Sequence, residues 1–301
     1  MGTHPDYRIY PSLLDKFQEL LDYESVAEEA WNKVSEAAHI RGEYLDCEIG
    51  DYKLTPHEMY DKIEIELINS INRCPHDLSE AADKGTAFNE IIDCLIENRK
   101  SKNKDCNIYS TTNENGLRVI RAEIHGFTFD YDVQLCKDIA SRFSCSLPQF
   151  FASSMMQTKY GNVEIYGYLD EWQGNEIIDL KTTGQYTFGK FERKWQRHAY
   201  PWCVINERLT TEVESFTYYV IEWAYQRKGE PLTAKSITPE TYTYNHATSE
   251  TLLKRHIENF IEWLESRREY ITDRRIFGGI NPDGYQGIPL TILSKSIENG
   301  K

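Results

Sequence analysis

Two short apolar stretches, each containing an aspartate near its end, constrain this chain more than any other feature. The first runs from Val163 to Asp170 and the second from Glu176 to Lys181. Both are rich in β-branched and aromatic residues, and the Gln-Gly-Asn between them is typical of a tight turn. The sequence therefore predicts a β-hairpin whose two strands bring Asp170 and Asp179 together.

Lys181 adds a third functional group to this hairpin. It follows Asp179 by two residues, and residues i and i+2 of a strand point to the same face. Hard divalent cations such as Mg²⁺ prefer carboxylate oxygens and keep waters for a phosphate substrate. An ammonium beside such a cation can stabilise developing negative charge or help to deprotonate a water. The pattern thus predicts metal-dependent chemistry on a phosphate ester, with Asp170, Asp179 and Lys181 as catalytic residues.

The order and spacing of these residues resemble the PD-(D/E)XK nuclease superfamily, and within it the RecB-like and phage-type exonucleases. The resemblance rests on Gly167-x-x-Asp170, then Ile178-Asp179-Leu180-Lys181-Thr182, then Gln196-x-x-x-Tyr200, and it covers roughly residues 78–223. It implies an α/β fold with a restriction-endonuclease-like core. In that core a mixed central sheet is flanked by helices in the order αβββαβ, here with an N-terminal helical extension.

The resemblance also implies an activity, which is metal-dependent hydrolysis of DNA phosphodiester bonds by an exonuclease on linear DNA. Asp170, Asp179 and the Leu180 carbonyl would hold Mg²⁺ or Mn²⁺, and Lys181 would act on the attacking water. Gln196 and Tyr200 lie four residues apart, hence on one helix face, and would position the DNA strand.

The helix expected over residues 78–98 carries one departure from the family pattern. RecB-like nucleases have Gly-Thr-x-x-His here, and the histidine binds the metal, whereas this chain has Asn89 after Gly85-Thr86. An asparagine oxygen is adequate for Mg²⁺, and Glu90 is the alternative ligand, so both are candidates. The departure supports a second hypothesis, in which a catalytically weakened or inactive nuclease fold acts as a DNA-binding or assembly module.

The charge of the chain is unevenly distributed. A net charge of −14 is unusual for a nucleic-acid enzyme, yet the segment after the hairpin is basic. Local potential decides phosphate binding, so four residues are candidates for lining a substrate groove. They are Lys190, Arg193, Lys194 and Arg197. The alternative is that they form only the solvated face of a helix.

Length and composition set the remaining expectations. We expect residues 1–75 to form the helical extension and residues 76–301 the nuclease domain with a C-terminal helix, as one compact unit. The chain lacks a signal-peptide pattern and an apolar run of membrane-spanning length, which predicts a cytoplasmic protein without membrane contact. Some members of the superfamily that this chain resembles bind an iron–sulfur cluster through one upstream cysteine and three cysteines near the C-terminus. This chain has seven cysteines with no Cys-x-x-Cys pair, and none follows Cys203, so we expect no such cluster. Expected partners are DNA and either further copies of the chain or a recombination protein.

Apolar periodicity and capping signals give the element predictions. Thr55-Pro56-His57-Glu58 combines a capping box with proline at the first helical position. Helices are predicted over residues 11–38 with a break near Asp22, 55–72, 78–98, 139–145, 188–208 and 248–271, strands over 118–124, 127–135, 151–160, 163–170, 176–183, 213–223 and 241–244, and a loop over 99–116.

Overall fold

The computed structural model describes residues 4–40, 54–75 and 77–290. Its elements in chain order are β1 (Tyr7–Ile9), α1 (Pro11–Leu21), α2 (Tyr23–Ile40), α3 (Pro56–Ile71), α4 (Glu80–Glu97), β2 (Cys106–Thr112), β3 (Arg118–Ile124), β4 (Phe127–Asp132), α5 (Val133–Arg142), β5 (Leu147–Thr158), β6 (Gly161–Gln173), β7 (Glu176–Thr183), α6 (Gln196–Asn206), β8 (Ser215–Trp223), β9 (Ala234–Thr243), α7 (His246–Ser266) and two short 3₁₀ turns, η1 (Arg268–Tyr270) and η2 (Arg274–Phe277).

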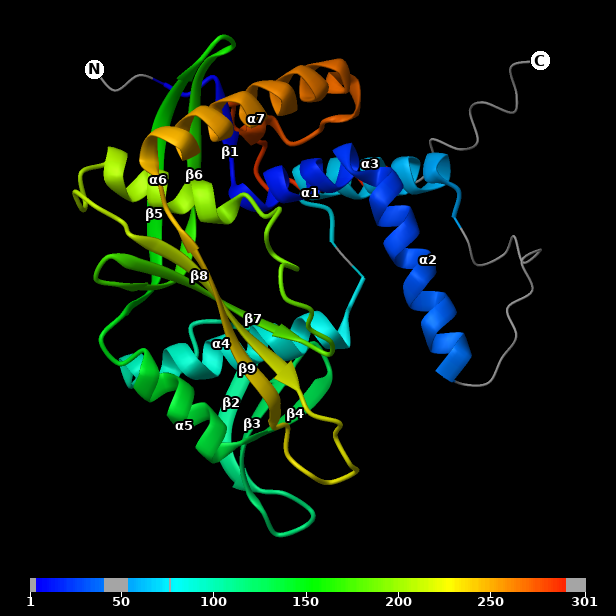
Figure 1. The fold of residues 1–301 in the computed structure, drawn as a ribbon, viewed down its shortest axis with the longest axis vertical. Coiled ribbons are helices and arrows are strands. Elements are labelled where there is room, and N and C mark those ends of the chain that lie inside the picture. The colour runs from blue at the N-terminus through cyan, green and yellow to red at the C-terminus, as the bar shows by residue number, and fades with distance from the viewer. Residues whose placement is uncertain (1–3, 41–53, 76, 291–301) are drawn as a thin grey trace.

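A mixed six-stranded sheet forms the centre of the molecule (Figure 1). Strands β5, β6 and β7 form an antiparallel meander, and α6 then crosses over so that β8 runs parallel to β7. Strand β9 is antiparallel to β8, and β1 lies parallel to the start of β6. The expectation of a mixed central sheet flanked by helices is confirmed.

Two hydrophobic cores lie on opposite faces of this sheet. The first lies among α1, α3, α6 and α7, and the second lies among α4, α5 and a separate three-stranded sheet, β2-β3-β4. Alternation along β7 assigns its side chains to the two cores, because Ile177 belongs to the first while Ile178 and Leu180 belong to the second. Strand β7 is therefore covered on both faces.

The N-terminal segment is part of the first core. Ile9 of β1 and Leu13, Leu14 and Phe17 of α1 are buried there, whereas α2 extends away from the sheet (Figure 1). Within residues 1–75 the structure thus adds a parallel edge strand to the predicted helices. Among the described residues, no helix combines the length and apolar character that a bilayer crossing requires.

Some predicted element bounds needed correction, and one element was confirmed in detail. The strand predicted over 127–135 ends at Asp132, because the Asp132 carboxylate accepts the Leu135 N–H at 2.7 Å and caps α5. The loop predicted over 99–116 contains β2, and the helix predicted from 188 begins at Gln196. The capping box of Thr55 and Glu58 is present, with both of its hydrogen bonds.

Candidate active site

The candidate site lies where β6 and β7 separate. Along one edge of β6, pairing with β1 ends at Ile165, and pairing with β7 begins only at Glu171. Asp170 is the residue of β6 that directly precedes this ladder. Backbone groups of β6 just before Glu171 are therefore not engaged in these two ladders, and the space beside them is available to side chains.

Three of the predicted catalytic residues meet in this space. The Asp170 carboxylate accepts the backbone N–H of Leu180 on β7 at 3.0 Å. Asp179, which is buried, forms an ion pair with Lys181, with 2.6 Å between Oδ2 and Nζ. The hairpin thus brings two carboxylates and one ammonium together, as the sequence predicted.

Mutual repulsion and burial govern the charges here. Burial, and next the neighbouring charge of Asp179, raise the pKa of Asp170 to about 7. Burial alone would lower the pKa of Lys181, but the carboxylates of Asp179 and Asp170 raise it, so Lys181 stays charged. Two acids therefore share one protonated ammonium, and a further cation would stabilise the ionised form of Asp170.

The Gln-x-x-x-Tyr helix lies against the same strand. Gln196 begins α6 one turn before Tyr200, whose pKa is raised by burial and then by the charges of Asp179 and Asp170. The ring of Tyr200 covers Gly167, where an added Cβ would lie 2.9 Å from the tyrosine oxygen. Glycine in the Gly-x-x-Asp motif is thus required for α6 to approach β6.

Helix α4 approaches β7 from the other face. A Cβ on Gly85 would lie 2.8 Å from Thr182 Oγ1, so glycine permits this close contact. Asn89 Nδ2 donates to the Leu180 carbonyl at 3.3 Å, and no described group hydrogen-bonds to its buried Oδ1. Glu90 is engaged elsewhere, because its Oε1 accepts from Arg99 and from the Lys102 backbone N–H, both at 2.7 Å. Of the two candidate ligands, Asn89 is the one with a contact to the hairpin.

The four predicted groove residues have separate surroundings. Arg193 pairs with Asp22 at 3.1 Å and Lys194 with Glu19 at 2.8 Å, so two of the positive charges are neutralised by acids of the N-terminal helical region. Arg197 lies over the Tyr242 ring, and Lys190 contacts the Thr183 hydroxyl at 3.0 Å. These side chains do not form one uninterrupted positive surface.

Sequence reasoning missed one acid near the site. Asp15 of α1 is buried and accepts the backbone N–H of Trp195, directly before α6. Burial raises its pKa to about 6, and the charges of Lys194, Lys181 and Asp179 also act on it. The contact between Asp15 and Trp195 joins residues 180 positions apart, so local patterns do not predict it. The sequence showed only an acid beside Leu14 in an amphipathic helix.

The donor set can be compared with the needs of a cation. Within the described ranges, no three His, Cys, Asp or Glu side chains are arranged as a metal-binding group. Two carboxylates and the Leu180 carbonyl are nevertheless close together, and two buried polar atoms beside them, Asn89 Oδ1 and the Tyr218 hydroxyl, have no described hydrogen-bond partner. A hard cation that retains several waters suits such a set, since water would complete its shell.

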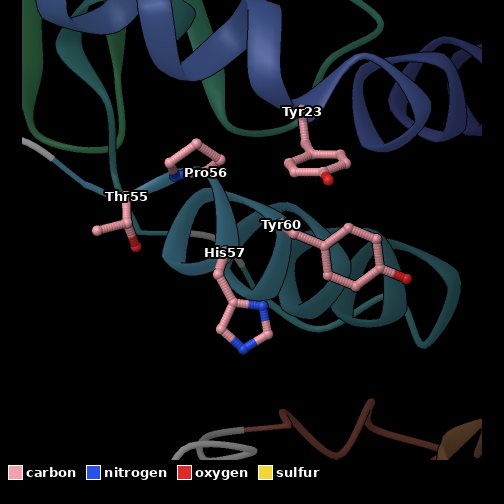
Figure 2. Close-up of a pocket in the computed structure, with 5 residues that line it drawn as sticks. All are labelled: Tyr23, Thr55, Pro56, His57 and Tyr60. Carbon is pink, nitrogen blue, oxygen red and sulfur yellow. The ribbon is translucent and has the colours of Figure 1, made fainter.

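A separate hollow differs from the candidate site in its chemical character. It has a volume of about 540 Å³ and is lined by Tyr23, Thr55, Pro56, His57 and Tyr60, at the starts of α2 and α3 (Figure 2). No carboxylate lines it, so the hollow offers an aromatic surface rather than an acid cluster. We therefore place the candidate active site at the separation of β6 and β7.

Neither a protein-family model nor a curated protein matches this chain. The assignment of function therefore depends on the geometry described above and on the motif resemblance.

Proposed function

We propose that this chain is a Mg²⁺- or Mn²⁺-dependent nuclease of the PD-(D/E)XK superfamily that hydrolyses DNA phosphodiester bonds, acting as an exonuclease on linear DNA. The observation that carries the proposal is the meeting of Asp170, Asp179 and Lys181 where two antiparallel strands separate. A hydrogen bond and an ion pair fix this arrangement, so it does not depend on motif spacing alone.

The order of the elements also supports the proposal. A restriction-endonuclease-like core is expected to contain a helix, three antiparallel strands, a helix and a strand. Here α4, the meander β5-β6-β7, α6 and β8 follow that order, with β2, β3, β4 and α5 inserted after α4. Helix α6 connects the parallel strands β7 and β8, and such crossovers are nearly always right-handed. The helix packs in the first core, on one face of the sheet.

Each residue has a distinct role in this proposal. Asp170, Asp179 and the Leu180 carbonyl would hold the cation, and Asn89, already bonded to that carbonyl, would orient it. When bound, Mg²⁺ or Mn²⁺ supplies Lewis acidity and a water of lowered pKa. Lys181 stays protonated beside Asp179 and would stabilise negative charge on the phosphate. Gln196 and Tyr200 would position the strand next to the acids.

The test is cleavage of end-labelled linear duplex DNA by the purified chain with Mg²⁺ or Mn²⁺. We expect metal-dependent shortening that EDTA and the substitution Asp179→Asn abolish. The control is Glu265→Gln, because Glu265 pairs with Arg268 and accepts from the Tyr7 hydroxyl, and it makes no described contact with the proposed site. Circular dichroism checks that both variants fold. Equal cleavage by wild type and Asp179→Asn would contradict the proposal.

The second candidate is a nuclease-fold protein that binds DNA without cutting it. The pairing of Arg193 and Lys194 with Asp22 and Glu19 favours it, because those charges are partly withdrawn from a substrate. DNA binding without metal-dependent cleavage would support this candidate. A closed circular duplex separates exonuclease from endonuclease, since only an endonuclease cuts a substrate without ends.

A further inference from the structure

One face of helix α1 contacts the three residues that directly precede α6. Four polar side chains of α1 and its C-terminal cap follow one another at helical spacing and therefore lie on this face: Asp15, Gln18, Glu19 and Asp22. The two at the C-terminal end form ion pairs with Arg193 and Lys194, and the other two contact Trp195. The N-terminal helix is thus attached to the start of the helix that carries the Gln-x-x-x-Tyr motif.

Asp15 caps the start of α6 from another helix. Helix α6 begins at Gln196, so Trp195 is its N-cap residue. In a capping box, a glutamate three residues further along the same helix accepts the N–H of the N-cap residue, whereas α6 has His198 at that position. The Asp15 carboxylate accepts this N–H instead, and it is buried, so water competes little for the bond. A negative charge is also favourable at the N-terminus of a helix.

The side chain of Trp195 is held as well. Its Nε1 donates to Gln18 Oε1 at 3.2 Å. Its ring stacks on His256 of α7, with 3.8 Å between ring centroids and 7° between ring planes. His256 Nε2 in turn forms a hydrogen bond with the Leu14 carbonyl at 3.1 Å. Backbone and ring of Trp195 are therefore both fixed to α1, directly or through His256, and α6 starts from a defined point.

Helix α6 extends from this fixed point to the candidate active site. Gln196 follows Trp195 directly, and Tyr200 lies one turn further along the helix. Tyr200 is buried against Gly167 of β6, three residues before Asp170. A shift at the start of α6 therefore moves both motif residues relative to the acids. Misplacement by about 1 Å can lower an enzyme's rate about 10²-fold, even when the change lies away from the reacting atoms.

We propose that Asp15 is a positioning residue of the proposed nuclease, which places Gln196 and Tyr200 by holding the start of α6. It acts through α6 and touches neither the cation nor the DNA. The inference rests on the proposed function and gives the N-terminal helix α1 a part in it. The hydrogen bond carries the effect, so an oxygen acceptor at this position is sufficient and a negative charge is not required.

The test compares two substitutions of one side chain. Asp15→Ala removes the acceptor, whereas Asp15→Asn keeps an oxygen that can accept the same N–H. For metal-dependent cleavage of end-labelled linear DNA, we expect kcat to fall at least about tenfold in the alanine variant and to stay within about threefold of wild type in the asparagine variant. Asp22→Ala is the matched control, because Asp22 lies on the same face but pairs with the side chain of Arg193, and it should cleave as wild type does.

Two further measurements do not depend on cleavage. Hydrogen exchange of the α6 backbone amides should become at least about tenfold faster in Asp15→Ala and stay unchanged in Asp15→Asn and Asp22→Ala. Calorimetric titration with MnCl₂ should give the same affinity in all variants, because Asp15 is not a ligand. Should Asp15→Ala fail to fold, Gln18→Leu replaces it, since this substitution removes the bond to the Trp195 ring. Its kcat should fall about fivefold, and an unchanged kcat would then overturn the inference.

The outcomes separate this inference from the proposed function. A wild type that cleaves no DNA contradicts the proposed function, whereas faster exchange in Asp15→Ala alone still supports Asp15 as the anchor of α6. Cleavage by Asp15→Ala at the wild-type rate overturns the positioning role. An equal loss in Asp15→Asn overturns it too, because charge rather than the hydrogen bond would then carry the effect. Weaker Mn²⁺ binding by Asp15→Ala would make Asp15 part of the cation site and is equally contrary to the proposal.

Discussion

Two clusters of acids lie near β7, and they differ in the cation that serves them. In the candidate site, Asp170 and Asp179 share Lys181 and one backbone N–H. At the end of α4, three acids gather around one arginine: Arg99 lies 2.7 Å from Glu90 and 3.7 Å from Asp93, and it also bonds to Glu97. A guanidinium has five donors in a planar fork, whereas an ammonium is a compact point charge on a flexible stem.

This difference indicates which acid cluster is available for chemistry. Arg99 lies within ion-pair distance of all three carboxylates, and Lys102 contributes a further contact to Glu97. Lys181 instead contacts Asp179, while the pKa of Asp170 is raised by burial and by Asp179. In the Arg99 cluster each acid lies within ion-pair distance of a cation, whereas in the candidate site no described cation forms an ion pair with Asp170. A group of acids is thus a candidate metal site only when its own cations leave it incomplete.

The largest expected effect distinguishes the two lysines. Lys181→Met should lower the rate of metal-dependent cleavage about 10³-fold, within the range for a catalytic acid or base, because no other described ammonium pairs with Asp179. Lys102→Met is the matched control, since Lys102 pairs with Glu97 in the Arg99 cluster and should leave the rate unchanged. Single-turnover cleavage of labelled linear DNA measures both. A loss below tenfold for Lys181→Met would show that Lys181 is not catalytic.

The second prediction concerns stability. Arg99→Met should lower the free energy of unfolding by about 3 kcal/mol, because removing one partner leaves buried carboxylates uncompensated. Asp93 and Glu90 are both shielded from solvent there, so water restores little of the lost interaction. Urea unfolding measures the change, with Arg118→Met on the exposed start of β3 as the control. Equal stability of the two variants would mean that Arg99 is dispensable.

The third prediction is metal-induced stabilisation. At a Mg²⁺ concentration about a hundred times its dissociation constant, binding should stabilise the fold by about 2.7 kcal/mol and raise Tm by about 5 °C. Asp170→Asn should abolish the shift, and Glu97→Gln should retain it, because only the incomplete cluster would take up a cation. Thermal unfolding with and without EDTA measures this. A shift that survives Asp170→Asn would place the cation elsewhere.

The hairpin could be predicted from sequence because its signals are local. Apolar strands, turn chemistry and i, i+2 spacing lie within about twenty positions, and the structure brings Asp170, Asp179 and Lys181 together as they indicate. Helix α3 was predictable for the same reason, since Thr55 and Glu58 bond to each other's backbone groups.

Features that depend on distant partners could not be predicted. Strand β1 has three residues and exists because it pairs with Val163–Ile165, far along the chain. The role of Asp15 depends on its contact with Trp195, and the charge of Arg193 is balanced by Asp22. Local patterns carry no record of such contacts, so the sequence left open whether the basic segment lines a groove or faces solvent, and it did not indicate that Glu19 and Asp22 lie beside it.

The smallest predicted effect tests the Arg99 cluster by pH. Burial, and next the charge of Glu90, raise the pKa of Asp93 to about 7 from 3.8. The folded state therefore holds this proton more tightly than the unfolded state, so the stability that Asp93 contributes is present below pH 4 and is lost as pH rises from about 4 to about 7. This change in the pKa of Asp93 corresponds to at most about 4 kcal/mol of folding free energy.

Asp93→Asn removes this pH-dependent penalty but also removes a carboxylate from Arg99. We therefore expect the variant to be about 1 kcal/mol more stable than wild type at pH 8, with the difference disappearing by about pH 4. Urea unfolding across this range in EDTA measures it, with Asp105→Asn on the exposed loop before β2 as the control. A lower stability of Asp93→Asn at pH 8 would contradict this prediction. It would mean that the ion pair with Arg99 stabilises the fold by more than the burial of the Asp93 carboxylate costs.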